Sequence, residues 1–203
     1  MNFYYKLDNY CIFIASRYFT SIDDFINLEK TSRRFRGNIE KFHYNPISVT
    51  DKTIIFFPFL QTLHLYDRKD PFITDEQIIG YAIWFSMEYE EYLFWKKTIN
   101  KITSKRVYYI DKNRNKSITI PSEVNELIDT SFTNNPVLQQ LTINHQIKYM
   151  TRECLLKCTF LNELLLPSNW KVCGNVIMIE DTHLRSVLLP SSIRTINKTK
   201  YLF

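Results

Sequence analysis

Cysteine and histidine are the residues of this chain that could bind a metal ion or act as a nucleophile and its base. Cys154 and Cys158 are four residues apart, but no further Cys or His lies at a spacing that would complete a zinc site. No Asp or nucleophile lies at a recognisable motif spacing from any of the four histidines, which are His43, His64, His145 and His183. The sequence also lacks G-x-S-x-G, H-E-x-x-H and glycine-rich phosphate motifs. It therefore predicts no catalytic residue, no metal site and no cofactor.

The composition is that of a globular protein, with 45% hydrophobic and 23% charged residues. The net charge of +5 is modest, and the cations form no long stripe of the kind that nucleic-acid binders show. One dense basic cluster occurs, consisting of Lys30, Arg33, Arg34, Arg36 and Lys41. A solvated helix face is the first interpretation of this cluster and a partner-binding patch the second. We expect protein partners and no nucleic acid.

No apolar run approaches the ~20 residues that a membrane span needs. The richest run, Ile54 to Leu60, is interrupted by Pro58. The N-terminus lacks the basic start and long apolar core of a secretory signal. We therefore expect a cytoplasmic protein with reduced cysteines, although a surface location stays open.

Apolar residues near the C-terminus recur every 23 residues around Pro121, Asn144, Pro167 and Pro190. An L-x-x-L-x-L pattern precedes three of these positions, as in Leu138 to Ile143 and Leu161 to Leu166. A period of 20 to 29 residues with this pattern is typical of a leucine-rich repeat solenoid. Such a solenoid is usually a recognition surface rather than a catalyst.

Each L-x-L segment predicts one strand of a parallel sheet on the concave side, with the leucines pointing into the core. Because side chains alternate along a strand, the intervening residues should point outward. They are Gln140, Thr142, Glu163, Leu165, Ser186 and Leu188. Leu165 and Leu188 are apolar although they should point outward. They could be anchors of a protein-binding face. Alternatively, leucine is used there for its sheet propensity, or the ends of the chain cover both residues.

Residues 45–117 predict less regular turns of the same solenoid. Leu60 to Tyr66 is another L-x-x-L-x-L unit, 79–85 and 106–110 are strand-like, and 87–97 predicts a short helix. Thr74 to Gln77 has the form of a capping box and predicts a short helical turn. We expect 111–117 to be an insertion.

Residues 1–44 predict two helices. In the first, Leu7, Tyr10, Cys11, Ile14, Ala15 and Tyr18 form one apolar face. Ile12, Phe13 and Phe19 lie off that face, so this helix is either buried on two sides or covered by another protein. Ser21 is the expected N-cap of the second helix.

The pattern L-x-x-L-x-L-P-x-x-V/I-x-x-L/I resembles the BspA-like, or Treponema-pallidum-type, leucine-rich repeat. The stretches 7–19, 23–28 and 32–35 resemble an F-box-like motif, and the combination resembles BspA-like repeat proteins of amoebic protists. This resemblance implies an α/β solenoid with a helical F-box-like segment over 1–44 and a leucine-rich repeat domain over 45–203. Within that domain, regular 23-residue repeats would run over 118–203, the last one incomplete.

The resemblance implies a non-catalytic protein–protein interaction module. Its sharper form is an adaptor that joins a client to a Skp/cullin-type ubiquitin ligase, with Leu7, Ile12, Phe13 and Phe19 contacting the Skp-type adaptor. The alternative is a BspA-like surface or adhesion protein. An enzyme whose residues converge only in the folded chain is the third possibility.

Overall fold

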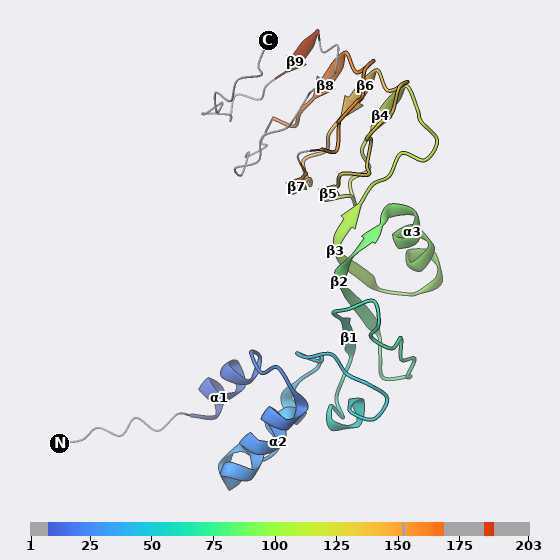
Figure 1. Cartoon of the computed structure of the whole chain (residues 1–203). Coiled ribbons are helices and arrows are strands. Elements are labelled where there is room, and N and C mark those ends of the chain that lie inside the picture. Colours follow the sequence, from blue (N-terminus) through green and yellow to red (C-terminus); the bar gives the residue numbers. More distant parts are fainter. Residues whose placement is uncertain (1–7, 152, 169–184, 189–203) are drawn as a thin grey trace, which may run out of the picture. The chain divides into compact units, whose positions relative to one another are not determined.

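The computed structural model describes residues 8–151, 153–168 and 185–188 (Figure 1). The chain divides into two compact units. The first unit comprises Met1–Phe85 and Phe94–Lys105, and the second comprises Ser86–Leu93 and Arg106–Phe203. Leu7 and the expected incomplete repeat after Pro190 lie outside the described residues.

The first unit begins with the two expected helices, α1 (Asn9–Ser16) and α2 (Ile22–Thr31). The predicted N-cap Ser21 is confirmed, since its hydroxyl accepts the Asp24 amide while Asp24 accepts the Ser21 amide at 3.0 Å. This reciprocal pair satisfies two amides at the start of α2. Three short 3-10 helices follow, namely η1 (Arg33–Phe35), η2 (Ile39–Lys41) and η3 (Ile54–Phe56).

Phenylalanine rings form the core beneath these helices. Phe25 packs edge-on against Phe42 and Phe57, with ring centroids 5.6 and 5.8 Å apart. Phe13 contacts Phe42 at 4.8 Å, and Phe19 contacts Phe25 at 5.0 Å. Edge-to-face packing of this kind adds to the free energy of burying the rings.

The predicted apolar face of α1 is wrong. Tyr10 and Tyr18 are 71% and 81% exposed, and Cys11 and Ala15 are exposed as well. The helix instead turns Phe13 and the buried Ser16 inward, where Ser16 accepts a 2.9 Å hydrogen bond from Asn38. The inward side offers a phenylalanine ring to the Phe42 cluster, so it buries more area than the predicted side would.

Strands β1 (Thr62–Leu65) and β2 (Gly80–Glu88) confirm the predicted strands, and α3 (Tyr89–Thr98) confirms the predicted helix. β1 and β2 are parallel, with Leu63 opposite Tyr81 and Leu65 opposite Ile83. β3 (Ile102–Tyr108) starts four residues before the predicted segment. The helical turn expected at Thr74–Gln77 is wrong, because these residues form only a turn in which Asp75 accepts the Gln77 amide.

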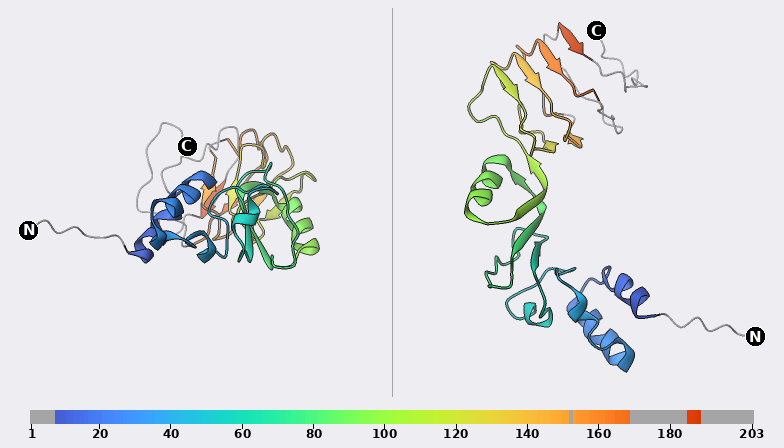
Figure 2. Two further views of the ribbon diagram at one scale, coloured as in Figure 1. Left: turned by 90° about the horizontal axis from the view of Figure 1, so that it is seen from below. Right: turned by 180° about the vertical axis from the view of Figure 1, so that it is seen from behind.

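The second unit carries the 23-residue repeats. β4 (Ser117–Thr119), β6 (Gln140–Thr142), β8 (Glu163–Leu165) and β9 (Ser186–Leu188) form a four-stranded parallel sheet (Figures 1 and 2). β5 (Glu126–Leu127) and β7 (Tyr149–Met150) belong to the other sheet, whose order is β1-β2-β3-β5-β7. The register places Gln140 opposite Glu163 and Glu163 opposite Ser186, which is the sequence period.

The solenoid is a β-solenoid, so the expected α/β solenoid is wrong on this point. Within 99–151 and 153–168 the segments that connect the strands contain turns and the short β5 and β7, with no helix. Pro121 and Pro167 lie two residues after the last residues of β4 and β8 and restrict the backbone there. Turns and short extended segments take the place of a helix in these connections.

Leucine side chains stack in register to form the core of the second unit. Ile118, Leu141 and Leu164 face one another on β4, β6 and β8 and are at most 5% exposed. Phe132 and Leu155, at equivalent positions of successive repeats, are buried as well. Each turn therefore depends on its neighbours for burial.

Buried polar side chains close the turns between strands. Asn135 accepts hydrogen bonds from the Val137 and Leu138 amides and donates to Asp111 at 2.6 Å. Cys158 lies 23 residues after Asn135 and donates its thiol to the Phe132 carbonyl at 3.1 Å. Burial raises the pKa of the Cys154 thiol to about 12. Both thiols are thus core groups rather than thiolate ligands.

Candidate protein-binding surface

The candidate surface is the side of the four-stranded sheet that faces away from the leucine core. Leu141 and Leu164, at the centres of β6 and β8, are fully buried. The side chains on either side of them are half-buried and lie on the opposite face; they are Gln140, Thr142, Glu163 and Leu165. The predicted inward and outward alternation is therefore confirmed for these four residues. The backbone of Ser186 and Leu188 continues the register in β9, and their side chains lie outside the described structure.

A polar row crosses this face from strand to strand. The Ser117 hydroxyl donates to Gln140 Oε1 at 2.8 Å, and Gln140 Nε2 donates to Glu163 Oε2 at 2.9 Å. The three residues are successive equivalents at 23-residue spacing. Because each donor points towards the next strand, these hydrogen bonds fix the side-chain rotamers of the row from Ser117 to the Glu163 carboxylate.

A second row runs parallel to the first, two residues further along each strand. It consists of Thr119, Thr142 and Leu165, in register with Leu188. The row becomes apolar towards Leu165. The face therefore presents an anion and a half-buried leucine side by side, held on rigid strands.

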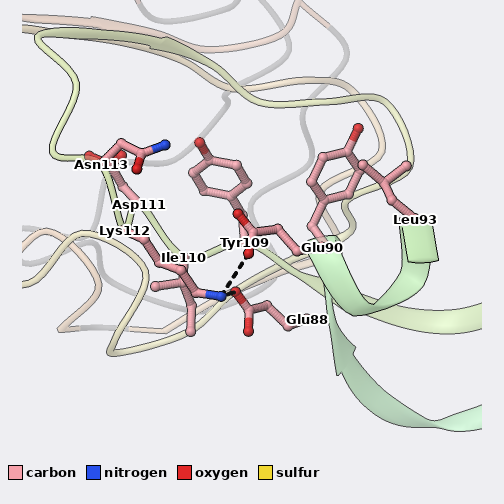
Figure 3. A pocket seen from close by; sticks show the side chains of 9 residues that line it. Glu88, Glu90, Leu93, Tyr109, Ile110, Asp111, Lys112 and Asn113 are labelled. Atoms are coloured by element: carbon pink, nitrogen blue, oxygen red, sulfur yellow. Dashed lines mark hydrogen bonds and ion pairs between the residues drawn. The ribbon is translucent and has the colours of Figure 1, made fainter. Parts of the chain in front are cut away.

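The second unit also contains a cavity of about 210 Å³ that sequence reasoning missed (Figure 3). Its lining residues are Glu88, Tyr89, Glu90, Leu93, Tyr109, Ile110, Asp111, Lys112 and Asn113. Lys112 Nζ lies 2.5 Å from Glu88 Oε1 and 2.8 Å from Glu90 Oε2. These two carboxylates raise the pKa of Lys112. The ammonium group is thus paired with both carboxylates at this cavity.

A buried carboxylate lies beside β3 in the same unit. Glu126, 2% exposed, accepts from Arg106 Nε at 2.6 Å and from the Ser86 hydroxyl at 2.9 Å. The repeat equivalent of Glu126 in the next turn is the exposed Tyr149. The burial of Glu126 could not be read from the sequence, because its equivalent in the next repeat, Tyr149, is exposed.

In the first unit, the outward side of β1 and β2 carries a cluster of aromatic rings. His64 stacks on Tyr44 with centroids 4.7 Å apart, and its Nδ1 lies 3.2 Å from the Tyr66 hydroxyl. Burial, with a smaller effect from Lys105, lowers the pKa of His64 to about 4. Trp84 contacts both the Tyr66 ring and the Lys105 ammonium group. His64 is therefore a neutral packing residue near neutral pH.

Within the described ranges, no group of three or more His, Cys, Asp or Glu side chains is arranged to hold a metal ion. Among the helices that the structure describes, none is long and apolar enough to cross a membrane. Ile12, Phe13 and Phe19, expected to contact an adaptor, are half-buried in the first unit. The structure therefore brings together the predicted outward residues of β6 and β8, while most of the F-box-like residues pack against their own unit.

A comparison with known protein families assigns the repeat to a known type. The BspA type leucine rich repeat region matches residues 84–203 with six copies. No curated protein and no solved structure is significantly similar to the chain. The matched region is more than half of the chain and includes the whole four-stranded sheet β4-β6-β8-β9. Leucine-rich repeats are generally a non-enzymatic protein-interaction fold. The chain belongs to the BspA-type leucine-rich repeat family.

Proposed function

We propose that the chain recognises a protein client through the outward face of β4, β6 and β8. The observation that carries this proposal is the pair of in-register rows that include Glu163 and Leu165. The hydrogen bonds along Ser117, Gln140 and Glu163 already order these side chains. Less conformational entropy is then lost when a partner binds.

Leu165 is the apolar anchor in this proposal. It is half-buried, so a partner removes its remaining apolar surface from water without disturbing the core. An anchor of this kind typically contributes about 1–2 kcal/mol to binding when it is truncated. Glu163, on the same strand and face, supplies a charge that selects a client with a complementary cation.

The test is an affinity capture from cell lysate with Leu165→Arg beside the unchanged chain. Phe160→Arg is the matched control, because Phe160 is 60% exposed and lies in the same unit outside the strands. We expect Leu165→Arg to lose a specific protein that Phe160→Arg retains, with both variants folded by circular dichroism. Retention of all bound proteins by folded Leu165→Arg would refute this surface.

A second candidate role is the link to a Skp/cullin-type ubiquitin ligase through the N-terminal helices. The exposed side of α1, with Tyr10 and Tyr18, favours a partner there. The F-box-like residues of this proposal are Leu7, Ile12, Phe13 and Phe19. A purified Skp-type adaptor should bind the chain and lose affinity for Tyr10→Ala and Tyr18→Ala, which leave the Phe13–Phe42 contact in place. Absence of binding to the unchanged chain would reject the adaptor role.

The alternative role is that of a BspA-like surface or adhesion protein, and the family match fits it equally. The adaptor role requires a cytoplasmic chain, whereas adhesion requires exposure outside the cell. Protease treatment of intact cells separates the two. Degradation of the chain under conditions that spare a cytoplasmic marker would favour adhesion, and protection would favour the adaptor.

A further inference from the structure

The four-stranded sheet of the second unit has an open edge at β4 (Figures 1 and 2). β4 is the first strand in the order β4-β6-β8-β9. Within residues 8–151, 153–168 and 185–188, β6 is the only strand that is hydrogen-bonded to β4. A strand in this position presents one row of backbone donors and acceptors that has no partner strand.

Two hydrogen bonds at the ends of β4 show which backbone groups form this open row. β6 bonds to the Lys116 carbonyl at 3.0 Å and to the Ile120 amide at 2.9 Å. Successive residues of a strand direct their bonding groups to alternate edges. The amides and carbonyls of Ser117 and Thr119 therefore point away from β6, towards the open edge.

Side-chain exposure agrees with an edge that nothing covers. Thr119 is exposed, whereas Thr142, the same residue at the equivalent position of the next repeat, is half-buried. Ser117 and its equivalent Gln140 differ in the same way. Ile118 between them is 5% exposed. The core is thus closed at this end of the sheet, and the edge is open only beside the strand.

β4 lacks the features that usually prevent pairing at an edge. Natural edge strands are protected by proline, lysine or a β-bulge. β4 is Ser-Ile-Thr, and its register with β6 runs without a bulge. Isoleucine and threonine also favour the extended conformation. The strand is therefore competent to pair on its second side.

We propose that the β4 edge binds an extended segment of a partner protein as an added strand. The backbone groups of Ser117 and Thr119 select this occupant, because another polypeptide backbone carries amides and carbonyls at the same spacing. A nucleic acid backbone offers no such alternation of donors and acceptors. Strand addition of this kind is a recurring mode of peptide recognition. The edge is distinct from the outward face of the sheet, so the proposal does not rest on the client-binding surface.

The polar row across the sheet specifies one side chain of the added strand. The Ser117 hydroxyl donates its proton to Gln140, and Gln140 Nε2 donates to Glu163. The oxygen of Ser117 can still accept a hydrogen bond. A glutamine opposite Ser117 in the added strand would donate to it, as Gln140 donates to Glu163. The sequence of β6, Gln-Leu-Thr, therefore fits the open edge.

The probe is a fluorescent synthetic peptide with the sequence of residues 138–144, which contains β6. Its affinity for the purified full chain is measured by fluorescence polarisation, and its position by NMR of the backbone amides. We expect the amide signals of Ser117 and Thr119 to shift most.

N-methylation of the peptide tests the backbone pairing directly. On β6 itself, the Gln139 carbonyl and the Ile143 amide bond to β8, so the Leu141 amide points the same way. N-methylation at the position of Leu141 should weaken the peptide about fivefold to tenfold, because a hydrogen bond to β4 is lost. N-methylation at the position of Thr142, whose amide points away from β4, should leave the affinity unchanged.

Thr119→Pro removes an amide of the open row from the chain. Proline is tolerated on an edge strand where the amide faces solvent, so the variant should stay folded by circular dichroism. It should bind the peptide about fivefold more weakly or worse. Thr119→Val is the matched control, because it keeps the amide and should bind normally. Leu165→Arg should also bind normally, which separates this edge from the client-binding face.

The proposal is overturned if the peptide does not bind, or if folded Thr119→Pro binds it as the unchanged chain does. Equal effects of the two N-methyl groups would also overturn it, and this comparison needs no variant of the chain. Self-association of the purified chain that Thr119→Pro abolishes would place a second copy at the edge and reject the partner segment.

Discussion

Removing the Arg106 side chain tests how the second unit tolerates a buried charge. Arg106 Nε is 2.6 Å from Glu126 Oε1, and the side-chain exposures are 56% and 3%. Arg106→Met would keep most of the aliphatic packing but leave the Glu126 carboxylate with the Ser86 hydroxyl as its remaining partner in this network. An uncompensated buried charge is among the few causes of a large destabilisation by one substitution.

The magnitude follows from the burial of the two partners. Breaking a fully buried ion pair from one side costs about 3–5 kcal/mol. Arg106 is half-exposed, so water can approach the vacated position and reduce that cost. We expect Arg106→Met to lower the free energy of unfolding by about 2–3 kcal/mol. The double variant Arg106→Met/Glu126→Gln removes the charge and still accepts from Ser86, so it should lose only about 1 kcal/mol.

Urea unfolding followed by far-ultraviolet circular dichroism measures these free energies. Lys116→Met is the matched control, because Lys116 is an exposed cation of the same unit, and it should change the value by less than about 0.5 kcal/mol. The reasoning is refuted if the double variant is as unstable as Arg106→Met. It is equally refuted if Arg106→Met matches the control.

Three further predictions concern the turns and the aromatic cluster. Lys157 and Asn134 occupy equivalent positions with φ of 59° and 60°, a conformation that asparagine tolerates better than lysine or alanine. Lys157→Asn should therefore raise the free energy of unfolding in urea by about 0.5 kcal/mol, and Asn134→Ala should lower it by about 1 kcal/mol. Asn135→Ala removes the acceptor of two amides and should cost about 2–3 kcal/mol in the same assay. His64 has a folded pKa of about 4 against 6.5, so its contribution is present above pH 6.5 and is lost as the pH falls towards 4. After allowing for its partial exposure, the loss should be about 1 kcal/mol, and His64→Phe should remove that pH dependence of thermal unfolding.

The repeat was predictable because its period constrains every residue. A slip of one position would turn Leu141 and Leu164 out of the core, so the 23-residue spacing fixes both the register and the face of each side chain. The outward placement of Gln140 and Leu165 follows directly. The even 23-residue spacing was recognised only from residue 118 onward. Before it β3 begins earlier than the predicted segment, although the family match reaches back to residue 84.

The features that sequence reasoning missed depend on contacts between non-equivalent segments. The face of α1 is decided by the Phe42 ring, which lies far along the chain from Phe13. The Arg106–Glu126 pair joins an irregular turn to a regular one. None of these contacts recurs at a regular spacing, so the repeat pattern of the sequence does not reveal them.

The outward rows have the physical features of a recognition surface. General acid–base catalysis, in contrast, is most effective with a group whose pKa lies near the working pH. Lys112 is paired with two carboxylates, Cys154 is protonated by burial, and burial, with a smaller effect from Lys105, lowers the pKa of His64. The polar row through Gln140 and Glu163, in contrast, is ordered and open to solvent. The described part of the second unit thus combines fixed charges with a rigid outward face, which is what selective protein binding requires.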